Sequence, residues 1–438
     1  MTSIPRLSSI LKQVFVEDAT HLAHELGIIQ RTRVFTAVSL LQVLVFGWLQ
    51  NPQAGSSALA RFAGQVGVKV SKQGIEERFT RATADWLLAV LRRGVQALVC
   101  AEAVSLPLLS RFEAVYLEDG STITLPAVLA EVWKGCGGSG AAAALKLTVR
   151  WDVRRGGMQG PYLQGGHQHE TQSPLREQKM ARGSLWIADL GYFGLIWLGE
   201  LVRQGVYFLI GYKEGVVLCT EQGQRIDLLK LLPSQEQERI EMPVRVGSRK
   251  QVHARLIASK MSPEVIKRRR KQLKEEAHRR GKPITAYQWE LVQWTIVLTN
   301  VAPCRLSGAE AMALMRARWQ IELLWKLWKD EGHVDEWRSE KPEHILCEVY
   351  AKLLGMLVQH WVLLLSCWDD PHRSLVGASR VIREQVSMLV HGLNGRLPLR
   401  KVLALITQAV QGGCSIPYRQ DRLSTSHRLV LVTDQCLT

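Results

Sequence analysis

Two aspartates follow short apolar runs that are typical of buried strands. Asp119 comes just after residues 114–117, and Asp189 comes just after residues 184–188. In open α/β sheets the carboxyl ends of strands form the active site, so we expect both carboxylates at one edge of a sheet. Carboxylates are the hard oxygen ligands that Mg²⁺ prefers. Pairs of such ions about 4 Å apart catalyse phosphoryl transfer on DNA, and this is the chemistry that the pattern predicts.

A third carboxylate, Glu322, lies in a segment, 307–329, that is expected to form one long helix. At about 100° per residue, Arg318, Glu322 and Lys329 fall within roughly 40° of one another on one face. The many apolar neighbours of Glu322 predict that most of this helix is buried, where a charged triplet is costly. A functional role for the triplet is therefore favoured over the alternative, an ordinary salt bridge on a solvated face.

The charge balance favours a polyanionic partner. The chain has 56 Lys and Arg residues against 40 Asp and Glu, a formal net charge of +16, and nucleic acid is the commonest partner of so basic a protein. The most basic stretch, 249–282, has at its centre Lys267, Arg268, Arg269, Arg270 and Lys271. We expect these residues to open a helix that tracks DNA phosphates. The alternative is a helix with a solvated basic face.

Hydrophobic periodicity predicts that the N-terminal region, 1–105, is helical, and the net positive charge of the chain favours DNA binding by this region. Two short helices separated by a glycine turn, within 56–62 and 74–82, suggest a helix-turn-helix, with Ser71 as an N-cap. An ordinary helical packing unit is the alternative.

The rest of the chain is expected to be an α/β protein. Strands alternate with helices between 112 and 211, and antiparallel strands follow up to 300. Ser307 and Glu310 predict a capping box at the start of the long helix. An apolar helix pair is expected over 343–370, and a loosely held tail over 417–438.

Neither a membrane span nor a zinc ribbon is predicted. No run of about 18 uninterrupted apolar residues occurs, and none of the eight cysteines forms a C-x-x-C pair. The first nine residues are not followed by the apolar stretch of a signal peptide. We therefore expect a cytoplasmic protein with reduced thiols.

The long helix segment resembles the insertion-sequence-4 family of bacterial DDE transposases. The family signature is Tyr-(2)-Arg-(3)-Glu-(6)-Lys, and Met315, Arg318, Glu322 and Lys329 have its spacing, with methionine in place of tyrosine. The segments around the two aspartates look like the family's first and second aspartate motifs. Leu190, which follows Asp189, stands where many relatives have arginine.

The resemblance covers about residues 110–365, and it implies a ribonuclease-H-like catalytic core with a β-rich insertion, a helical N-terminal DNA-binding region and a helical C-terminal region. The boundaries expected on this basis are 1–105 for the DNA-binding region, 106–212 and 296–375 for the two parts of the core, 213–295 for the basic insertion, and 376–438 for the C-terminal region and tail.

The resemblance also implies the roles of the site residues. Asp119, Asp189 and Glu322 would bind two Mg²⁺ ions, for which Mn²⁺ could substitute, and Arg318 and Lys329 would contact phosphates beside the scissile bond. Some relatives stack a tryptophan on a base flipped out of the duplex, and Trp294 resembles that residue. The alternative for this tryptophan is a place in the core.

The function expected is that of a transposase that cuts its element out and joins it to new DNA. Its partners would be double-stranded DNA, as terminal inverted repeats and as target, and a second copy of the chain in the DNA complex. It would be cytoplasmic and associated with the nucleoid, without a membrane. Two alternatives stay open: a ribonuclease-H-like nuclease that cuts without joining, and an inactive DNA-binding regulator.

Overall fold

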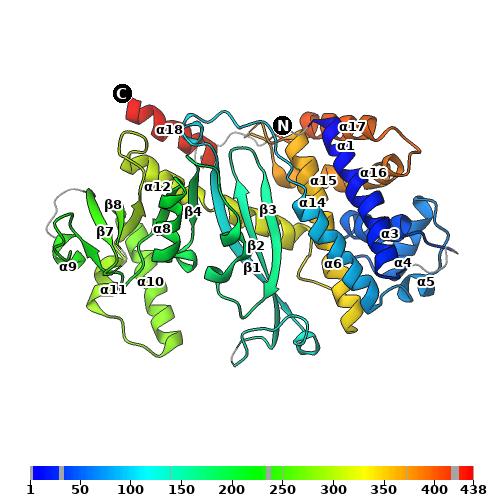
Figure 1. The fold of residues 1–438 in the computed structure, drawn as a ribbon, viewed down its shortest axis with the longest axis horizontal. Coiled ribbons are helices and arrows are strands. Elements are labelled where there is room, and N and C mark those ends of the chain that lie inside the picture. Colours follow the sequence, from blue (N-terminus) through cyan, green and yellow to red (C-terminus); the bar gives the residue numbers. More distant parts are fainter. Residues whose placement is uncertain are drawn as a thin grey trace. The chain divides into compact units, whose positions relative to one another are not determined.

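The computed structural model describes residues 3–28, 34–138, 140–232, 238–249, 251–370, 372–415 and 424–437. The chain forms two compact units, which are described separately. The helical unit comprises Met1–Ser105, Gly120–Gln168 and Gln320–Leu423, and the sheet unit comprises Leu106–Asp119, His169–Trp319 and Ser424–Thr438. Strand β1, Val115–Leu125 (Figure 1), belongs to both units, because the division falls between Asp119 and Gly120.

A mixed β-sheet forms the centre of the sheet unit. Its strands follow the order β1-β4-β5-β9-β8-β7-β6. β4 is parallel to β1 and β5 is parallel to β4, whereas the other neighbours are antiparallel. The bounds are β4 Leu185–Ala188, β5 Tyr207–Gly211, β6 Leu218–Cys219, β7 Arg239–Val246, β8 Val252–Lys260 and β9 Trp294–Thr299. The predicted strands are confirmed, and the antiparallel ones continue the same sheet.

One hydrophobic core joins this sheet to the helix α8. Trp186, Phe208, Leu256 and Leu298 come from four strands, and Leu198 comes from α8; each is fully buried. The helices of the sheet unit are α7 Pro107–Ser110, α8 Leu195–Arg203, α9 Leu228–Leu231, α10 Pro263–Arg280, α11 Ala286–Leu291, α12 Gly308–Ala317 and α18 Thr425–Leu437. The core therefore fixes the strands that carry the candidate carboxylates.

The basic stretch forms the helix α10, as predicted. Gly281 ends it in the left-handed conformation, with φ 61°, which glycine adopts without strain. Arg269 donates hydrogen bonds to the carbonyl oxygen of Trp294 at 3.1 Å and to the Thr295 hydroxyl at 2.9 Å. Arg270 lies over the Trp289 ring at 4.6 Å. These two arginines hold α10 on the sheet unit.

The other three cations of the predicted stretch face solvent. Lys267, Arg268 and Lys271 are exposed, while Arg269 and Arg270 are half-buried. Lys271 is paired with Glu275 on the next turn, at 3.8 Å. α10 thus has a docking side and a basic solvent side, and only the latter is available to a ligand.

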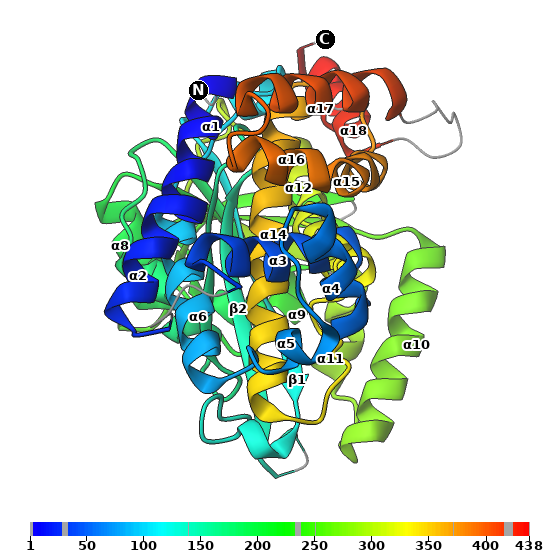
Figure 2. The same ribbon diagram turned by 90° about the vertical axis from the view of Figure 1, so that its right-hand side faces the viewer.

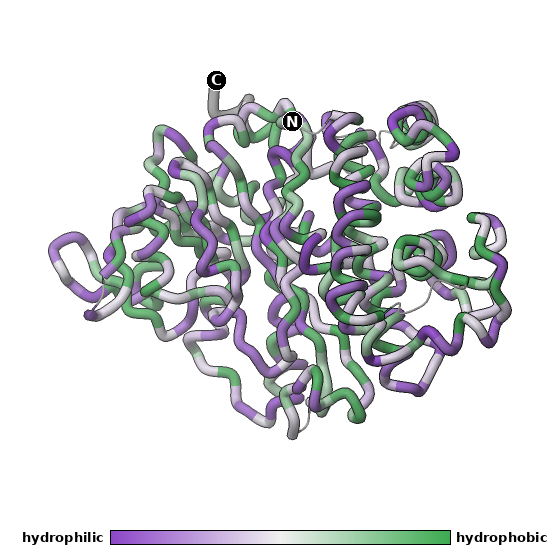
Figure 3. Tube along the Cα trace, turned by 45° about the vertical axis from the view of Figure 1, so that its right-hand side comes forward, coloured by the Kyte–Doolittle hydropathy of each residue, from purple (hydrophilic) through white to green (hydrophobic). Residues whose placement is uncertain are grey.

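The helical unit is built around the long helix α14, Pro342–Ser366. Figure 2 shows α3 and α6 lying alongside it. The other helices of the unit are α1 Ile4–Lys12, α2 Ala19–Glu25, α3 Ala37–Gln50, α4 Ser56–Gln65, α5 Lys72–Glu76, α6 Arg81–Gln96, α13 Gln320–Lys326, α15 Leu375–Glu384, α16 Val386–Leu393 and α17 Leu399–Gly413. Hydrophobic and hydrophilic residues are interspersed along these helices, so each can pack one side and solvate the other (Figure 3).

α14 is long and apolar enough to cross a membrane by length and composition alone. However, 94% of its most apolar window is buried within the structure, as in the core helix of a folded protein. Inside it, Lys352 pairs with Glu348 at 2.8 Å, and the Lys352 ammonium also donates to the carbonyl oxygens of His333 and Glu336. These bonds compensate part of the cost of burying the pair.

The helical unit also contains a hairpin, β2 Ala143–Asp152 and β3 Met158–Gly165, which are antiparallel. Within this unit the strand order is β3-β2-β1. Every residue of β2 is buried. The hairpin confirms two predicted strands.

Two predictions for the N-terminal region are confirmed, the pair of short helices and the N-cap residue. α4 and α5 are the two expected short helices, and the Ser71 hydroxyl accepts from the Gly74 N–H at 3.1 Å. α5 ends at Glu76, so the predicted segment 74–82 is divided between α5 and α6.

Three predictions about helices are wrong. The segment 307–329 is not one helix, because α12 ends at Ala317 and α13 begins at Gln320, followed by a π-helical turn, Leu327–Glu331. No proline or glycine marks the break, so hydrophobic periodicity could not predict it. The capping box of Ser307 and Glu310 is confirmed.

The other two corrections concern the C-terminal part. The expected helix pair over 343–370 is the single helix α14, since no residue breaks its apolar pattern before Ser366. The expected tail, 417–438, contains the helix α18, and its part before 424 lies outside the described residues. The cysteines for which the structure describes a side chain are all free thiols.

Candidate active site

Asp119 and Asp189 lie side by side on neighbouring strands of the sheet unit. β1 and β4 are parallel, with Glu118 paired to Ala188, so the two aspartates are one residue further along. Neighbouring strands are about 4.8 Å apart, and residues in register point to the same face of the sheet. The strand register therefore agrees with the prediction that these two carboxylates lie close together.

The prediction that β1 ends at Asp119 is wrong, because the strand continues to Leu125. After Gly120, buried Ile123 and Leu125 alternate with exposed Thr122 and Thr124, which is the pattern of a half-buried strand. Asp119 is therefore held in mid-strand, whereas Asp189 follows the last residue of β4 directly. A carboxylate within a strand is held more firmly than one in a loop.

The neighbouring acid, Glu118, faces the opposite side of the sheet. It is fully buried and accepts a hydrogen bond from the Trp186 indole N–H at 2.9 Å. Trp186 is itself fully buried on β4. This bond ties β1 to β4 immediately beside the two aspartates and fixes their spacing.

Arg318 lies next to one of the two candidate aspartates, Asp189. Its guanidinium Nη2 lies 3.9 Å from the Asp189 Oδ1, and its side chain is 13% exposed, against 55% for Asp189. The sequence placed Arg318 beside Glu322 on one helix face, but Arg318 lies in the turn after α12. The contact with Asp189 is one that helical spacing could not predict.

Tyr192 and Glu170 also belong to this part of the sheet unit, and sequence reasoning missed both as site residues. The Tyr192 hydroxyl is buried and has no hydrogen-bond partner among the described residues. Burial raises its pKa, and the nearby negative charges of Glu118, Asp119 and Glu170 raise it further, so it stays protonated. It is thus a hydroxyl donor amid carboxylates.

Glu170 lies beside the turn that follows Asp189. A Cβ added at Gly191 would lie 3.5 Å from its Cγ atom. In the sequence Glu170 is close to His167 and His169, which are residue types that can bind zinc. In the structure the His167 ring contacts the carbonyl oxygen of Lys134 at 3.0 Å, which indicates a loop contact. The only available signal for Glu170 was this local cluster of polar residues.

Glu322 and Lys329 belong to the helical unit. Glu322 is half-buried in the first turn of α13. The Lys329 ammonium donates to the carbonyl oxygen of Thr122 on β1 at 3.1 Å. Thr122 is three residues after Asp119, so Lys329 contacts the strand that carries the first aspartate.

The expectation that apolar neighbours bury this segment is wrong at two positions. Trp319 is 62% exposed and Leu323 is 53% exposed. The Trp319 N–H bonds to the carbonyl oxygen of Arg316, three residues back, and this tight turn directs the chain out of the helical path. Both side chains are available to a partner.

The donor set fits a divalent cation in its chemistry. Within the described ranges, however, no group of three His, Cys, Asp or Glu side chains is close enough to hold one metal ion. Asp119 and Asp189 are both oxygen ligands of the kind that Mg²⁺ takes, and Mg²⁺ commonly uses one or two carboxylates together with waters and substrate phosphates.

Trp294 is the first residue of β9 and is 5% exposed. It lies within the core of the sheet unit, with the Lys260 ammonium 6.0 Å from its ring. In this conformation its ring has little surface to offer a base. The burial agrees with the alternative that the sequence left open, a core tryptophan; base stacking stays a prediction.

Replacing Trp294 with alanine separates these two roles. The family resemblance implies two DNA steps that can be followed separately, nicking at the element end and closure of that end into a DNA hairpin. For a core residue we expect a loss of about 3–5 kcal/mol of unfolding free energy, and both DNA steps should fall together. For a stacking residue, hairpin formation alone should fall, by about 5- to 150-fold, since stacking contributes about 1–3 kcal/mol per base. Nick rate, hairpin rate and melting temperature should be measured on one preparation. An unchanged melting temperature with selective loss of the hairpin would contradict the core role.

Comparison with known proteins gives the family context for this geometry. Residues 164–357 match the family described as Transposase DDE domain. Over these residues the chain is similar to a transposase DDE domain. Asp189 and Glu322 lie inside the matched range, and Asp119 precedes it.

Several curated relatives are similar over most of the chain. The transposase for insertion sequence element IS231B of Bacillus thuringiensis subsp. berliner is 24% identical over 93% of this chain and 90% of its own length. The transposase for element IS231C of the same organism is 25% identical, covering 77% and 75%. The transposase for element IS1151 of Clostridium perfringens is 23% identical, covering 82% and 81%. With the DDE domain, these relatives support a DNA transposase.

Proposed function

We propose that this DNA transposase cuts its element out of DNA and joins it to a new site, with Asp119, Asp189 and Glu322 as the catalytic carboxylates. The observation that carries the proposal is the register of β1 and β4, which puts two aspartates side by side. The DDE domain match, which includes Asp189 and Glu322, supports the third residue.

The fold proposed for the catalytic core is ribonuclease-H-like. Its support is the antiparallel hairpin β2–β3, followed by β4 and β5 with β4 parallel to β1. Membership of the insertion-sequence-4 family is supported by the spacing of Arg318, Glu322 and Lys329.

The cofactor proposed is Mg²⁺, with Mn²⁺ as a substitute, held by Asp119, Asp189 and Glu322. Bound there, two such ions would activate the attacking oxygen and stabilise the leaving oxygen. The chain's own residues orient the site: Arg318 limits the movement of the Asp189 carboxylate, and the Trp186 indole fixes Glu118 behind Asp119. The protonated Tyr192 hydroxyl can donate a hydrogen bond to a carboxylate.

DNA would be held by exposed cations of α10 and by two partly buried cations beside the aspartate strands. Lys267, Arg268 and Lys271 form a basic solvent side on α10, and the Lys329 ammonium and Arg318 guanidinium lie beside the aspartate strands. These groups suit phosphate oxygens, for which arginine offers paired donors. Terminal repeats and target DNA are the proposed substrates, and a homodimer in the DNA complex, acting in the nucleoid, is the proposed assembly.

A supercoiled plasmid that carries the element with its flanking DNA tests the proposal. Incubated with the protein and Mg²⁺, it should give excised element and joined product. Cuts without joined product would favour the nuclease, and a mobility shift without cuts would favour the inactive regulator.

A further inference from the structure

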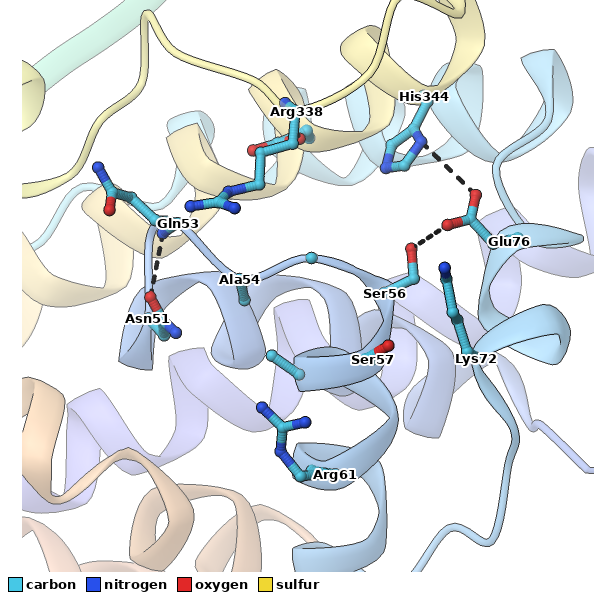
Figure 4. A pocket seen from close by; sticks show the side chains of 13 residues that line it. Asn51, Gln53, Ala54, Ser56, Ser57, Arg61, Lys72, Glu76, Arg338 and His344 are labelled. Carbon is cyan, nitrogen blue, oxygen red and sulfur yellow. Dashed lines mark hydrogen bonds and ion pairs between the residues drawn. The ribbon is translucent and has the colours of Figure 1, made fainter.

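A cavity of about 470 Å³ in the helical unit contains none of the candidate catalytic residues. Its walls are the loop and first turn of α4, the helix α5, and residues 338–348 (Figure 4). The side chains that define its charge are Arg61, Lys72, Arg338, Glu76 and Glu348. The cavity therefore contains both positive and negative side chains. The charge that it presents to a ligand depends on which of these side chains are already paired with one another.

None of the three basic side chains forms an ion pair within the part of the chain that the structure describes, although Glu348 accepts a hydrogen bond from the Arg338 backbone N–H at 3.4 Å. Figure 4 shows the guanidinium groups of Arg338 and Arg61 pointing toward the loop before α4 from opposite sides. Lys72 lies near Ser56, at the first turn of α4. Three unpaired cations that line one cavity repel each other, and a bound anion would relieve this repulsion.

The two acids, in contrast, are already engaged. Glu76 accepts a hydrogen bond from the Ser56 hydroxyl and faces the His344 ring at 3.8 Å. Glu348 is fully buried and paired with Lys352 at 2.8 Å. Burial lowers the pKa of His344, so the positive charge of the cavity comes from the arginines and the lysine.

The backbone adds donors at the same place. α4 has glycine, Gly55, at its N-cap. The Ala58 N–H donates to the Gly55 carbonyl oxygen, and among the described residues no side chain accepts from the N–H groups of Ser56 and Ser57. Those N–H groups point out of the helix start, where the helix dipole also favours negative charge. The Ser57 side chain and the Asn51 and Gln53 amides line the same space and can bond a sugar or a phosphate ester.

We propose that this cavity binds a phosphate of the DNA backbone, with Arg61 and Arg338 on either side and the first turn of α4 beneath it. The inference rests on the proposed function, since it assigns to the transposase a defined anchor for its DNA. The volume suits a sugar-phosphate unit rather than a bare phosphate ion, and the amides beside the arginines suit its ester and sugar oxygens. The contact is to the backbone and so should not depend on base sequence.

The test uses full-length protein and a fluorescein-labelled duplex of mixed sequence. Affinity is measured over a series of salt concentrations for the wild type, Arg61→Gln, Arg338→Gln and the double variant. Each lost phosphate contact should lower the slope of log affinity against log salt by about 0.9, so the double variant, which removes the one proposed contact, should lose about 0.9 from the slope. Arg93→Gln, which removes an exposed cation from α6 of the same unit, is the matched control.

A fall in slope for the pocket variants, with the control unchanged, supports the site. An unchanged slope in the double variant overturns it, and so does an equal fall in the Arg93 control, which would indicate general charge alone. Inorganic phosphate is titrated in parallel. If it raises the melting temperature of the wild type but not of the double variant, while the slope does not change, the cavity takes free phosphate and the DNA contact is overturned.

The supercoiled plasmid separates this inference from the proposed function. If the double variant keeps the wild-type salt slope while the wild type still gives joined product, only the phosphate site fails. If the wild type neither binds the duplex nor acts on the plasmid, the transposase proposal fails as well. Melting temperatures check folding, and Lys72→Gln is the replacement if an arginine variant does not fold.

Discussion

Replacing Asp119, Asp189 or Glu322 with alanine is expected to lower the rate of DNA cleavage by about 10³-fold or more while leaving DNA affinity near that of the wild type. Each carboxylate would hold a divalent ion whose contribution to the transition state is several kcal/mol, and each 1.36 kcal/mol changes the rate about tenfold. The cations that would hold DNA are different side chains, so binding should survive. Cleavage rate and affinity are measured on the same preparations.

The matched control for this prediction is Glu221→Ala, which removes an exposed carboxylate from the same sheet unit. Cleavage by this variant should equal that of the wild type. If one of the three alanine variants keeps the wild-type cleavage rate, the residue that it replaces is not catalytic. A variant that loses DNA affinity to the same extent as cleavage would show that the change acts through folding or binding.

Changing Lys267, Arg268 and Lys271 together to glutamine should flatten the salt dependence of DNA binding by about 2–3 units of slope. These three cations form the exposed side of α10. When a phosphate contact is lost, DNA binding releases fewer counterions. The slope of log affinity against log salt then falls by about 0.9 per contact for duplex DNA. Affinity at low salt should fall most, because screening already weakens these contacts at high salt.

Arg269→Gln and Arg270→Gln are the matched controls on the same helix. They remove the hydrogen bonds to Trp294 and Thr295 and the contact with Trp289, so they should lower the melting temperature and leave the slope nearly unchanged. If instead the triple variant keeps the wild-type slope, α10 is a helix with a solvated basic face and its role on DNA is wrong.

Much of the sheet could be predicted because its strands are apolar on both faces. The runs at 184–188 and 207–211 are buried throughout or nearly so, and such runs read clearly as central strands. β1 was predicted too short because Gly120 and the hydroxyl residues after it are typical of a turn. The strand continues beyond Gly120 because the side chains of Ile123 and Leu125 are buried by tertiary packing.

The candidate site could be predicted less completely. Asp119 and Asp189 could be predicted because each follows an apolar run that is typical of a buried strand, and the register of β1 and β4 agrees with their pairing. The contact of Arg318 with Asp189 depends on a break between two helices, and no proline or glycine in the sequence marks that break. Tyr192 and Glu170 carry no spacing that indicates a site, and only the fold shows them beside the carboxylates.

The most direct measurement of the central claim is the joining of a precut DNA end to a target. A labelled duplex that ends in the 3′-hydroxyl of the element is mixed with a supercoiled target plasmid, Mg²⁺ and the protein, and the labelled strand is followed on a denaturing gel. We predict that the wild type moves the label into the plasmid and that Asp119→Ala, Asp189→Ala and Glu322→Ala do not. Labelled strand that stays free with the wild type, or joined product formed by any of the three variants, would contradict catalysis by these carboxylates.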